Sequence, residues 1–223
     1  MKLVNSDYNI SISLEEDAIQ ILTIENQQAF RKMVGELWEE SEGKDGSWIL
    51  SDNNSPVQLA KNLIVVFNPY TIDANDKKVL SKLYSELSEL ASEKYMMEVE
   101  TINNHIVGLL TEVTHDVPYF IDYRTDIDLQ ALFKIYNIKI DVEYNSLLER
   151  ITDYIRAFHN ICNIRVFVFI NLKDYLSCDE LKLLYEFVLY EKVHLMLIEG
   201  HQSANVEPES HLIIDKDLCM INM

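Results

Sequence analysis

Hydrophobic positions along the chain follow two different periods. Four short runs, at 18–24, 62–67, 165–171 and 193–198, are apolar at nearly every position. They are rich in β-branched and aromatic residues, which is typical of strands buried on both faces. Between the last two runs, Ser177 is followed by Glu180 in the spacing of a capping box that opens a helix. A strand–loop–helix–strand unit with a right-handed crossover has parallel strands, so the pattern predicts a layered α/β domain.

The two ends of the chain add to this domain. Residues 3–14 alternate around a turn, and residues 212–221 alternate around Lys216-Asp217, so a hairpin is expected at each place. After the strand at 18–24, Asn26 is expected to cap a helix. This strand–turn–helix reads IENQQAFRK at the turn and has no glycine, whereas a phosphate-binding loop needs glycines and a lysine there. A working nucleotide site is therefore not expected.

The middle of the chain has helical periodicity instead. Asp73 is expected to cap a long helix with leucines at 80, 83, 87 and 90, and a second apolar stripe runs from 99 to 113. The break at 92–95 predicts that these helices pack antiparallel as a hairpin. A short helix at 129–136, a short strand at 138–142 and a third stripe at 148–162 follow. The predicted organisation is a discontinuous α/β head, 1–71 and 163–223, with an inserted helical leg, 72–162.

Composition limits the class of protein. The 223 residues, 48% of them hydrophobic, are enough for a proper core, and no apolar run approaches the length of a membrane helix. Three scattered cysteines do not indicate a disulfide framework, so a cytoplasmic protein without membrane contact is expected. The net charge of −18 repels nucleic acid unless basic residues gather on one protected surface.

Carboxylates cluster in one loop of the middle segment. Asp116, Asp122, Asp126 and Asp128 lie within thirteen residues and could converge on a hard cation such as Ca²⁺, which takes several oxygen ligands. Their spacing is not that of an EF-hand. A solvated acidic loop is the competing interpretation.

Catalytic motifs are not evident. The six histidines form no metal-binding doublet, and neither a Gly-x-Ser-x-Gly elbow nor a cysteine–histidine signature occurs. The residues predict no enzyme.

The nineteen basic residues are spread along the chain rather than bunched. Candidates for binding an anionic partner at the edges of the α/β domain are Lys134, Lys139, Arg156, Arg165 and Lys173. Taken singly, each is also explained as a surface charge that maintains solubility. If copies of the chain assembled around an axis, these side chains could line one lumen while acidic residues faced outward.

Three segments together resemble the small DNA-end-binding adaptation protein of type II-A CRISPR loci. They are NLIVVFNPYTIDAND, FKIYNIKIDVEYNSLLERI, and RVFVFINLKDYLSCDEL followed by VHLMLIEGH. The resemblance covers nearly the whole chain and rests on the order and spacing of the segments. It implies an α/β fold with a degenerate P-loop-NTPase-like head that has lost nucleotide hydrolysis, and an inserted helical leg.

The same resemblance implies a function. It predicts a non-enzymatic homotetrameric ring that threads double-stranded DNA from its ends, is supported by Ca²⁺ and no nucleotide, and acts in spacer acquisition beside the integrase complex and the RNA-guided nuclease of the locus. Lys139 is the closest match among the basic residues, and the calcium region corresponds to 116–128. This chain has Pro118, Tyr119, Phe120 and Arg124 there, where the family is denser in glutamate.

Two other functions are compatible with the residues. One is an acidic protein–protein adaptor that docks a partner helix through the apolar seam of its helical leg. The other is a diverged nucleotide-binding ATPase with an unorthodox site, which the missing glycine loop disfavours.

Overall fold

The computed structural model describes residues 1–222 and separates into two compact units. The first joins Met1–Ala74 to the segment that begins at Val142, and the second is Asn75–Asp141. The chain therefore leaves the first unit once and returns to it, and each unit is described by itself below. No helix in the part of the chain that the structure describes is long and apolar enough to span a membrane.

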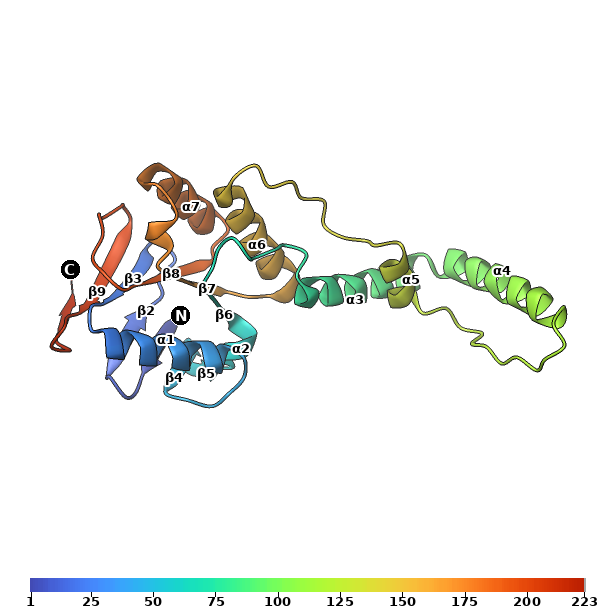
Figure 1. Cartoon of the computed structure of the whole chain (residues 1–223), viewed down its shortest axis with the longest axis horizontal. Coiled ribbons are helices and arrows are strands. Elements are labelled where there is room, and N and C mark those ends of the chain that lie inside the picture. Colours follow the sequence, from blue (N-terminus) through green and yellow to red (C-terminus); the bar gives the residue numbers. More distant parts are fainter. Residues whose placement is uncertain (223) are drawn as a thin grey trace. The chain divides into compact units, whose positions relative to one another are not determined.

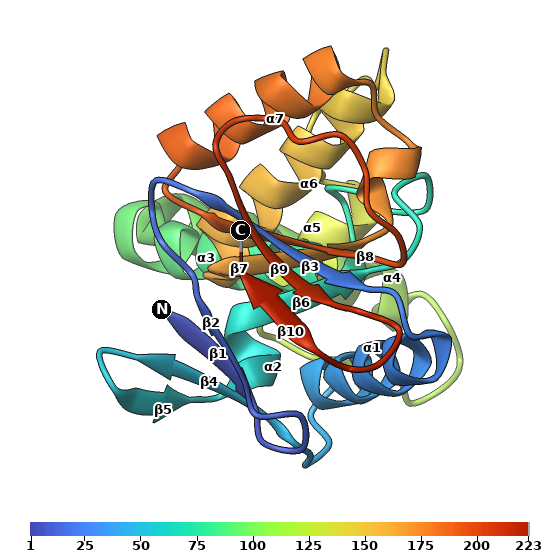
Figure 2. The ribbon, with the colours of Figure 1, turned by 90° about the vertical axis from the view of Figure 1, so that its left-hand side faces the viewer.

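A six-stranded sheet is the centre of the first unit (Figure 2). Its strand order is β10-β9-β3-β8-β7-β6, and the five strands from β9 to β6 are parallel. Only β10 is antiparallel to its neighbour. The strands are β3 (Ile19–Ile24), β6 (Leu63–Val66), β7 (Val166–Ile170), β8 (His194–Glu199), β9 (Glu209–Ile214) and β10 (Met220–Asn222). The four predicted strands, the parallel pairing of β7 with β8 and the closing hairpin are confirmed.

Helices cover both faces of this sheet (Figure 2). On one face lie α6 (Leu147–Cys162) and α7 (Cys178–Tyr190), and on the other lies α1 (Gln27–Ser41). The predicted caps form: the Asn26 side chain accepts hydrogen bonds from two amides of α1, and Ser177 and Glu180 form a capping box on α7. Every side chain of β7 is buried, as expected for a strand covered on both faces.

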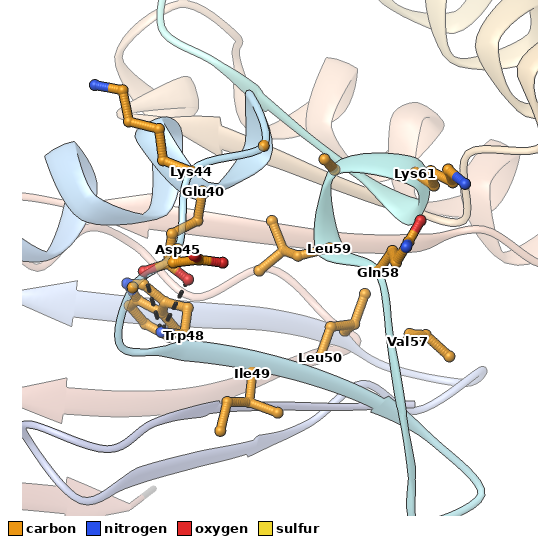
Figure 3. A pocket seen from close by; sticks show the side chains of 13 residues that line it. Glu40, Lys44, Asp45, Trp48, Ile49, Leu50, Val57, Gln58, Leu59 and Lys61 are labelled. Atoms are coloured by element: carbon orange, nitrogen blue, oxygen red, sulfur yellow. Dashed lines mark hydrogen bonds between the residues drawn. The ribbon is translucent and has the colours of Figure 1, made fainter.

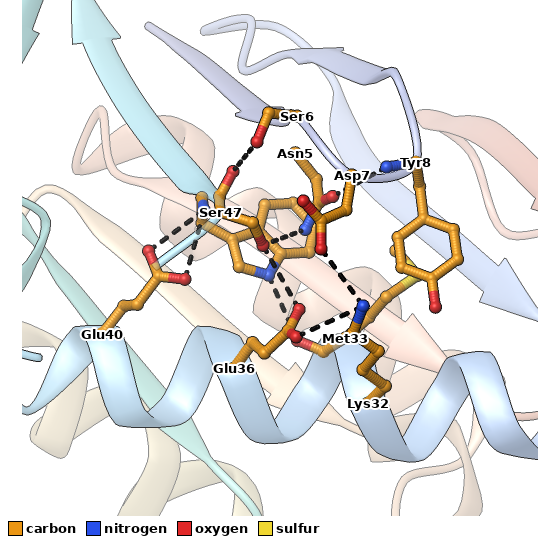
Figure 4. A network of polar contacts seen from close by, with 10 residues as sticks. Asn5, Ser6, Asp7, Tyr8, Lys32, Met33, Glu36, Glu40 and Ser47 are labelled. Carbon is orange, nitrogen blue, oxygen red and sulfur yellow. Dashed lines mark hydrogen bonds and ion pairs between the residues drawn. The ribbon is translucent and has the colours of Figure 1, made fainter. Parts of the chain in front are cut away.

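A small antiparallel sheet packs beside α1. Its order is β2-β1-β4-β5, formed by β1 (Lys2–Asn5), β2 (Ile10–Ser13), β4 (Trp48–Asp52) and β5 (Ser55–Val57). The indole of Trp48 donates to the Met33 carbonyl at 3.2 Å, and its backbone amide donates to the Glu40 carboxylate. Lys32 pairs with Asp7 at 3.1 Å across the same contact (Figure 4). These bonds, together with shared core residues, join the small sheet to α1.

The second unit consists of α3 (Lys77–Lys94), α4 (Met96–His115), α5 (Leu129–Ile135) and connecting segments. Asp76, not the expected Asp73, caps α3, because the Asp76 side chain reaches the Lys78 amide at 2.7 Å. The predicted antiparallel hairpin is wrong: α4 runs on from α3 after the single residue Tyr95 (Figure 1). The expected strand at 138–142 is also wrong, since this segment has no strand partner and bonds to side chains of α3 and its approach.

Helix α6 belongs to the first unit, although the sequence assigned its stripe to the leg. Its buried face, which includes Ile151, Ile155 and Phe158, packs within the α/β unit, and Tyr154 lies against Phe167 of β7 with ring centroids 6.4 Å apart. In the structure the inserted unit therefore ends at 141 rather than at 162. The stripe indicated a buried face but not which partner buries it.

Candidate functional site

The second unit holds five exposed lysines on α3, α5 and the segment after α5. We call Lys77, Lys78, Lys82, Lys134 and Lys139 the lysine group. Asn75–Ser85 and Leu129–Ile140, which contain them, include a single acidic residue, Asp76. The lysine group is thus a basic stretch in a chain whose net charge is −18.

Specific bonds hold these segments together. The Tyr84 hydroxyl of α3 donates to the Ile138 carbonyl at 2.8 Å, and the Asn75 side chain exchanges hydrogen bonds of 2.8 and 3.0 Å with the backbone of Ile140. Lys139 lies between these two anchored residues. The Tyr84 ring also packs on Phe133, beside Lys134, at a centroid distance of 6.4 Å. The fold therefore places residues separated by fifty positions on one pair of adjoining elements.

The lysines of α3 oppose the local preferences of a helix. Lys77 and Lys78 occupy the first turn, where the positive end of the helix dipole favours acidic residues, and α3 has none in that turn. Lys78 and Lys82 are four residues apart, so they are neighbours on the helix surface and repel each other. Among residues 1–222, no carboxylate pairs with Lys134 or Lys139. A concentration of positive charge against these local preferences favours a role in binding an anion.

Three of the five predicted basic residues, Arg156, Arg165 and Lys173, lie in the first unit with acidic partners. Arg165 donates to Asp52 at 2.7 Å and to the Asn62 side chain at 3.1 Å, and its hydrogen bond holds the pKa of Asp52 below the ordinary value. Arg156 pairs with Asp153 at 2.9 Å and lies over the Phe187 ring. Both guanidinium groups are half-exposed but engaged, so an anion would compete with these partners.

Lys173 corrects a sequence expectation. Its side chain is 3% exposed and forms an ion pair of 2.8 Å with Glu209, whose side chain is fully buried. The ammonium also donates to the Ala204 carbonyl at 3.0 Å. Lys173 does not lie on a surface open to DNA, because β9 and the loop before it bury its charge.

The four aspartates of the predicted calcium region do not form a cation site within one copy. In the described part of the chain, no group of three or more histidine, cysteine, aspartate or glutamate side chains is placed to hold a metal ion. Asp128 caps α5 by accepting from the Ala131 amide at 2.9 Å, and Asp116 lies near His115 at the end of α4. Asp126 and Asp128 line an open hollow of about 440 Å³, and Asp122 lies outside it. The residues as placed do not fit Ca²⁺, so no role is derived for the ion.

Helix α4 presents an apolar face that the described residues leave largely exposed. None of its residues is buried. Its exposed apolar side chains range from 39% exposed for Ile106 to 75% for Met97, and the set comprises Met96, Met97, Ile102, Ile106, Leu109 and Val113. An exposed apolar surface of this kind marks an interaction site.

In the turn between β3 and α1, the Asn26 side chain occupies the backbone amides that a phosphate would need. The Asn26 carboxamide oxygen accepts from the Gln28 and Ala29 amides at 3.1 and 3.0 Å. Amides at such a helix start are the groups that would hold a phosphate. Here an uncharged oxygen of the chain already uses them.

A hollow of about 490 Å³ lies in the first unit between the end of α1, the β4–β5 hairpin and α2 (Leu59–Asn62) (Figure 3). Glu40 is buried there and both of its oxygens accept from the Trp48 amide at 3.1 Å, while burial raises its pKa. Lys44 and Lys61 point away from the hollow (Figure 3). The one buried charge of this lining is thus used to hold β4.

Sequence reasoning found Lys134 and Lys139 but missed Lys77, Lys78 and Lys82. One signal was present in the sequence: two lysines follow directly on a helix cap, where acidic residues are the rule. Their association with Lys139 was not visible, because it depends on side-chain bonds from Tyr84 and Asn75 to a segment without regular structure.

Comparisons with known proteins agree on one family. Residues 40–218 match the family model described as CRISPR-associated protein (Cas_Csn2). A CRISPR-associated protein Csn2 of Enterococcus faecalis is 24% identical over 210 residues, covering 88% of this chain and 91% of the relative. One of Streptococcus agalactiae is 22% identical over 204 residues, covering 90% and 89%. The crystal structure of Stu0660 of Streptococcus thermophilus is similar in fold, with a TM-score of 0.61 at 16% identity over 96% of this chain and 75% of that one.

Proposed function

Because this chain belongs to the family of CRISPR-associated proteins described as Cas_Csn2, we propose that it binds the ends of double-stranded DNA during spacer acquisition. Binding is independent of sequence and involves no catalysis. The observation that carries the proposal is the lysine group of the second unit. Its five exposed ammonium groups lie on two segments with one acidic residue, held side by side by the bonds of Tyr84 and Asn75.

Lysine contacts to phosphate suit this task. Phosphate contacts position a protein on DNA without reading bases, and each one releases condensed counterions. All members of the lysine group are lysines, whose ammonium groups suit phosphate oxygens, so the group itself offers no amide side chain to hydrogen-bond with base edges. The chain as a whole carries a net charge of −18, which repels the duplex and disfavours binding outside this stretch.

We further propose a homotetrameric ring. The apolar face of α4 supports assembly, because a twenty-residue helix with no buried side chain is only marginally stable alone. Covering it with another copy would remove that surface from water. A ring would also bring four lysine groups around one axis, where they could surround a duplex. The integrase complex and the RNA-guided nuclease of the same locus are the proposed partners.

Calcium support remains a prediction of the family resemblance alone. The four aspartates do not converge within one copy, so ligands would have to come from rearrangement or from a second copy. The molecular mass in solution with and without a chelator tests this dependence together with the tetramer.

The α/β unit is proposed to be a P-loop-like domain that has lost nucleotide binding. Its strand–turn–helix at β3 and α1 has the required order, but Asn26 takes the amides that a phosphate would need. Nucleotide binding detected by calorimetry would instead favour the diverged ATPase.

An acidic adaptor is the second candidate function, favoured by the exposed face of α4. In that case the lysine group is irrelevant and α4 docks an apolar helix of another protein. Lys139→Glu separates the two functions, because it would lower DNA affinity and leave a purely proteinaceous partner bound.

A graded test uses Lys82→Gln in the lysine group and Lys94→Gln as its matched control at the other end of the same helix. Removing one phosphate contact is expected to lower the slope of log affinity against log salt by about 1. Lys82→Gln should show this drop in titrations of a linear duplex at several salt concentrations. Lys94→Gln should keep the slope of the parent protein. Equal slopes for all three proteins would contradict the assignment of the lysine group as the DNA-binding surface.

A further inference from the structure

A network of buried charges in the first unit joins Glu199, at the carboxyl end of β8, to Glu209, at the amino end of β9. Its centre is Glu209, the first residue of β9, whose side chain is fully buried. The Glu209 carboxylate accepts four hydrogen bonds: from the Tyr185 hydroxyl of α7 at 2.6 Å, from Lys173 at 2.8 Å, from His211 at 3.0 Å and from the Val206 amide at 3.1 Å. Glu209 therefore connects a helix, a turn and a strand to the loop that precedes it.

That loop is the β8–β9 loop, Gly200–Pro208. Three of its bonds lie next to this network, and others join Gln202 to Glu25 at 2.9 Å, Pro208 to Ile19 at 2.9 Å and Asn205 to His211 at 3.2 Å. The Val206 amide bonds to Glu209, the Ala204 carbonyl accepts from the Lys173 ammonium, and the Gly200 amide donates to the Asn171 side chain at 2.8 Å. Two of the three depend on the Lys173–Glu209 pair. Beneath the loop is a cavity of about 210 Å³, lined in part by Thr23, Asn205 and Glu209.

A second buried carboxylate lies next to this pair. Glu199, the last residue of β8, is fully buried, and one of its oxygens accepts from the Lys173 backbone amide at 3.3 Å. Its other oxygen, Oε2, has no hydrogen-bond partner within the described residues. A buried polar atom without a partner is rare and costly. The cost is smaller when Glu199 is neutral, since an ionised carboxylate needs more compensation than a protonated one.

Lys173 is thus shared between two carboxylates, with Glu209 on its ammonium and Glu199 on its amide. When Glu199 is neutral, the positive charge of Lys173 and the negative charge of Glu209 cancel within the buried network. With Glu199 ionised, the buried network carries one more negative charge, and the ammonium is attracted in two directions. The other titratable groups around the network are Asp174 of the turn, which pairs with His201 of the loop, Tyr185 of α7 and His211 of β9. The pKa of Glu199 is raised to about 7, mainly by burial and also by the charge of Asp174, while the hydrogen bond from the Lys173 amide and the charge of its ammonium oppose the rise.

We propose that Glu199, Lys173 and Glu209 form a proton-operated latch on the β8–β9 loop. When Glu199 is neutral, Lys173 holds Glu209 and Ala204, and the loop covers the cavity. When Glu199 ionises, it draws the ammonium away from these partners and the loop loosens. Loosening exposes Glu209 and Thr23 in the cavity. Thr23 lies near the carboxyl end of β3, the end of parallel strands at which layered α/β domains bind ligands.

The Val206 amide reports on the latch directly, because its hydrogen bond is to Glu209. Its hydrogen exchange in the full-length protein is to be compared at pH 6 and pH 8, after correction for the intrinsic chemical rate. Ionisation across this range is expected to raise the opening equilibrium about tenfold, by linkage to the difference between the buried and the released carboxyl group. In Glu199→Gln, which keeps the size of the side chain but cannot ionise, the corrected exchange should be the same at both pH values.

Two further variants keep the test decisive. Glu207→Gln, which removes an exposed acid from the same loop, should retain the tenfold response. Glu209→Gln should exchange fast at Val206 at both pH values, because a single amide oxygen cannot accept all four bonds of the carboxylate and does not neutralise Lys173. The proposal is overturned if the parent protein shows no pH response at Val206. It is equally overturned if Glu199→Gln retains the full response, which would then belong to His201 or His211.

Discussion

Three glutamates of the first unit have buried side chains that accept hydrogen bonds from backbone amides. Glu40, Glu199 and Glu209 are each enclosed, and each is bonded to backbone amides that position a neighbouring segment. The sequence predicted none of these roles, because an isolated glutamate in an acidic chain has no distinguishing pattern. Lys173 shows the same limit: its position after β7 was predicted, but its burial depends on Glu209, which lies thirty-six residues further along the chain.

Glu199 makes the stability of the protein depend on pH. Its pKa is raised from the ordinary value of 4.5 to about 7 by burial, so the folded state favours the protonated form. The contribution of Glu199 to the free energy of unfolding is therefore fully present below pH 4.5 and is lost as the pH rises through 7. Linkage gives a loss of about 2–3 kcal/mol in the free energy of unfolding between pH 5 and pH 8. When the free energy of unfolding is measured by denaturant titration, Glu199→Gln should lack this loss of about 2–3 kcal/mol between pH 5 and pH 8. The same pH dependence in the variant and the parent protein would contradict this role of Glu199.

Gly46 is required by the Glu40 side chain. A Cβ atom at position 46 would overlap the Glu40 carboxylate, which bonds to the Trp48 amide. Gly46→Ala should lower the free energy of unfolding by about 1–3 kcal/mol, because a buried amide or carboxylate loses its partner. Gly35→Ala is the control, since it lies in α1 with no atom within 4 Å of an added Cβ. Higher helix propensity should stabilise that variant by about 0.5–1 kcal/mol. A neutral effect at position 46 would show that Glu40 can move without cost.

At the scale of elements, strands were easier to predict than the partners of helices. Continuous apolar runs rich in β-branched residues marked β3, β6, β7 and β8 within a residue or two, since that pattern is typical of short strands inside a layered domain. The stripes of α3, α4 and α6 looked alike in the sequence. In the structure the stripe of α6 is buried in the first unit, that of α3 contacts α5, and that of α4 is exposed. Periodicity gives the face of a helix but not what covers it.

The exposed face of α4 makes a prediction about assembly. Leu109 is 61% exposed within the chain, so Leu109→Ser should leave the folding of a single copy nearly unchanged. If α4 joins copies, the variant should have a lower molecular mass in solution than the parent protein at equal concentration, as measured by light scattering. Leu183→Ser, on α7 and 55% exposed, is the matched control and should keep the parent mass. An unchanged mass for Leu109→Ser would argue that α4 binds a different protein or nothing.

On the scale of the whole molecule, charge is the property that the fold reorganises. A net charge of −18 argued against DNA, and the nineteen basic residues showed no linear patch. Folding removes Lys173 from the surface, engages Arg156 and Arg165 with acids, and leaves the lysine group on the second unit. The fold class and the inserted unit could be inferred from periodicity and resemblance. The basic surface could not, because it depends on which charges the fold neutralises.

The central claim is that the protein loads onto DNA from its ends. The most direct measurement compares binding to one DNA sequence in linear form and as a covalently closed circle, at equal and moderate salt. A ring that threads a duplex should bind the linear form and ignore the closed circle, and cutting the circle once should restore binding. Equal binding to both forms, or binding to neither, would contradict the account.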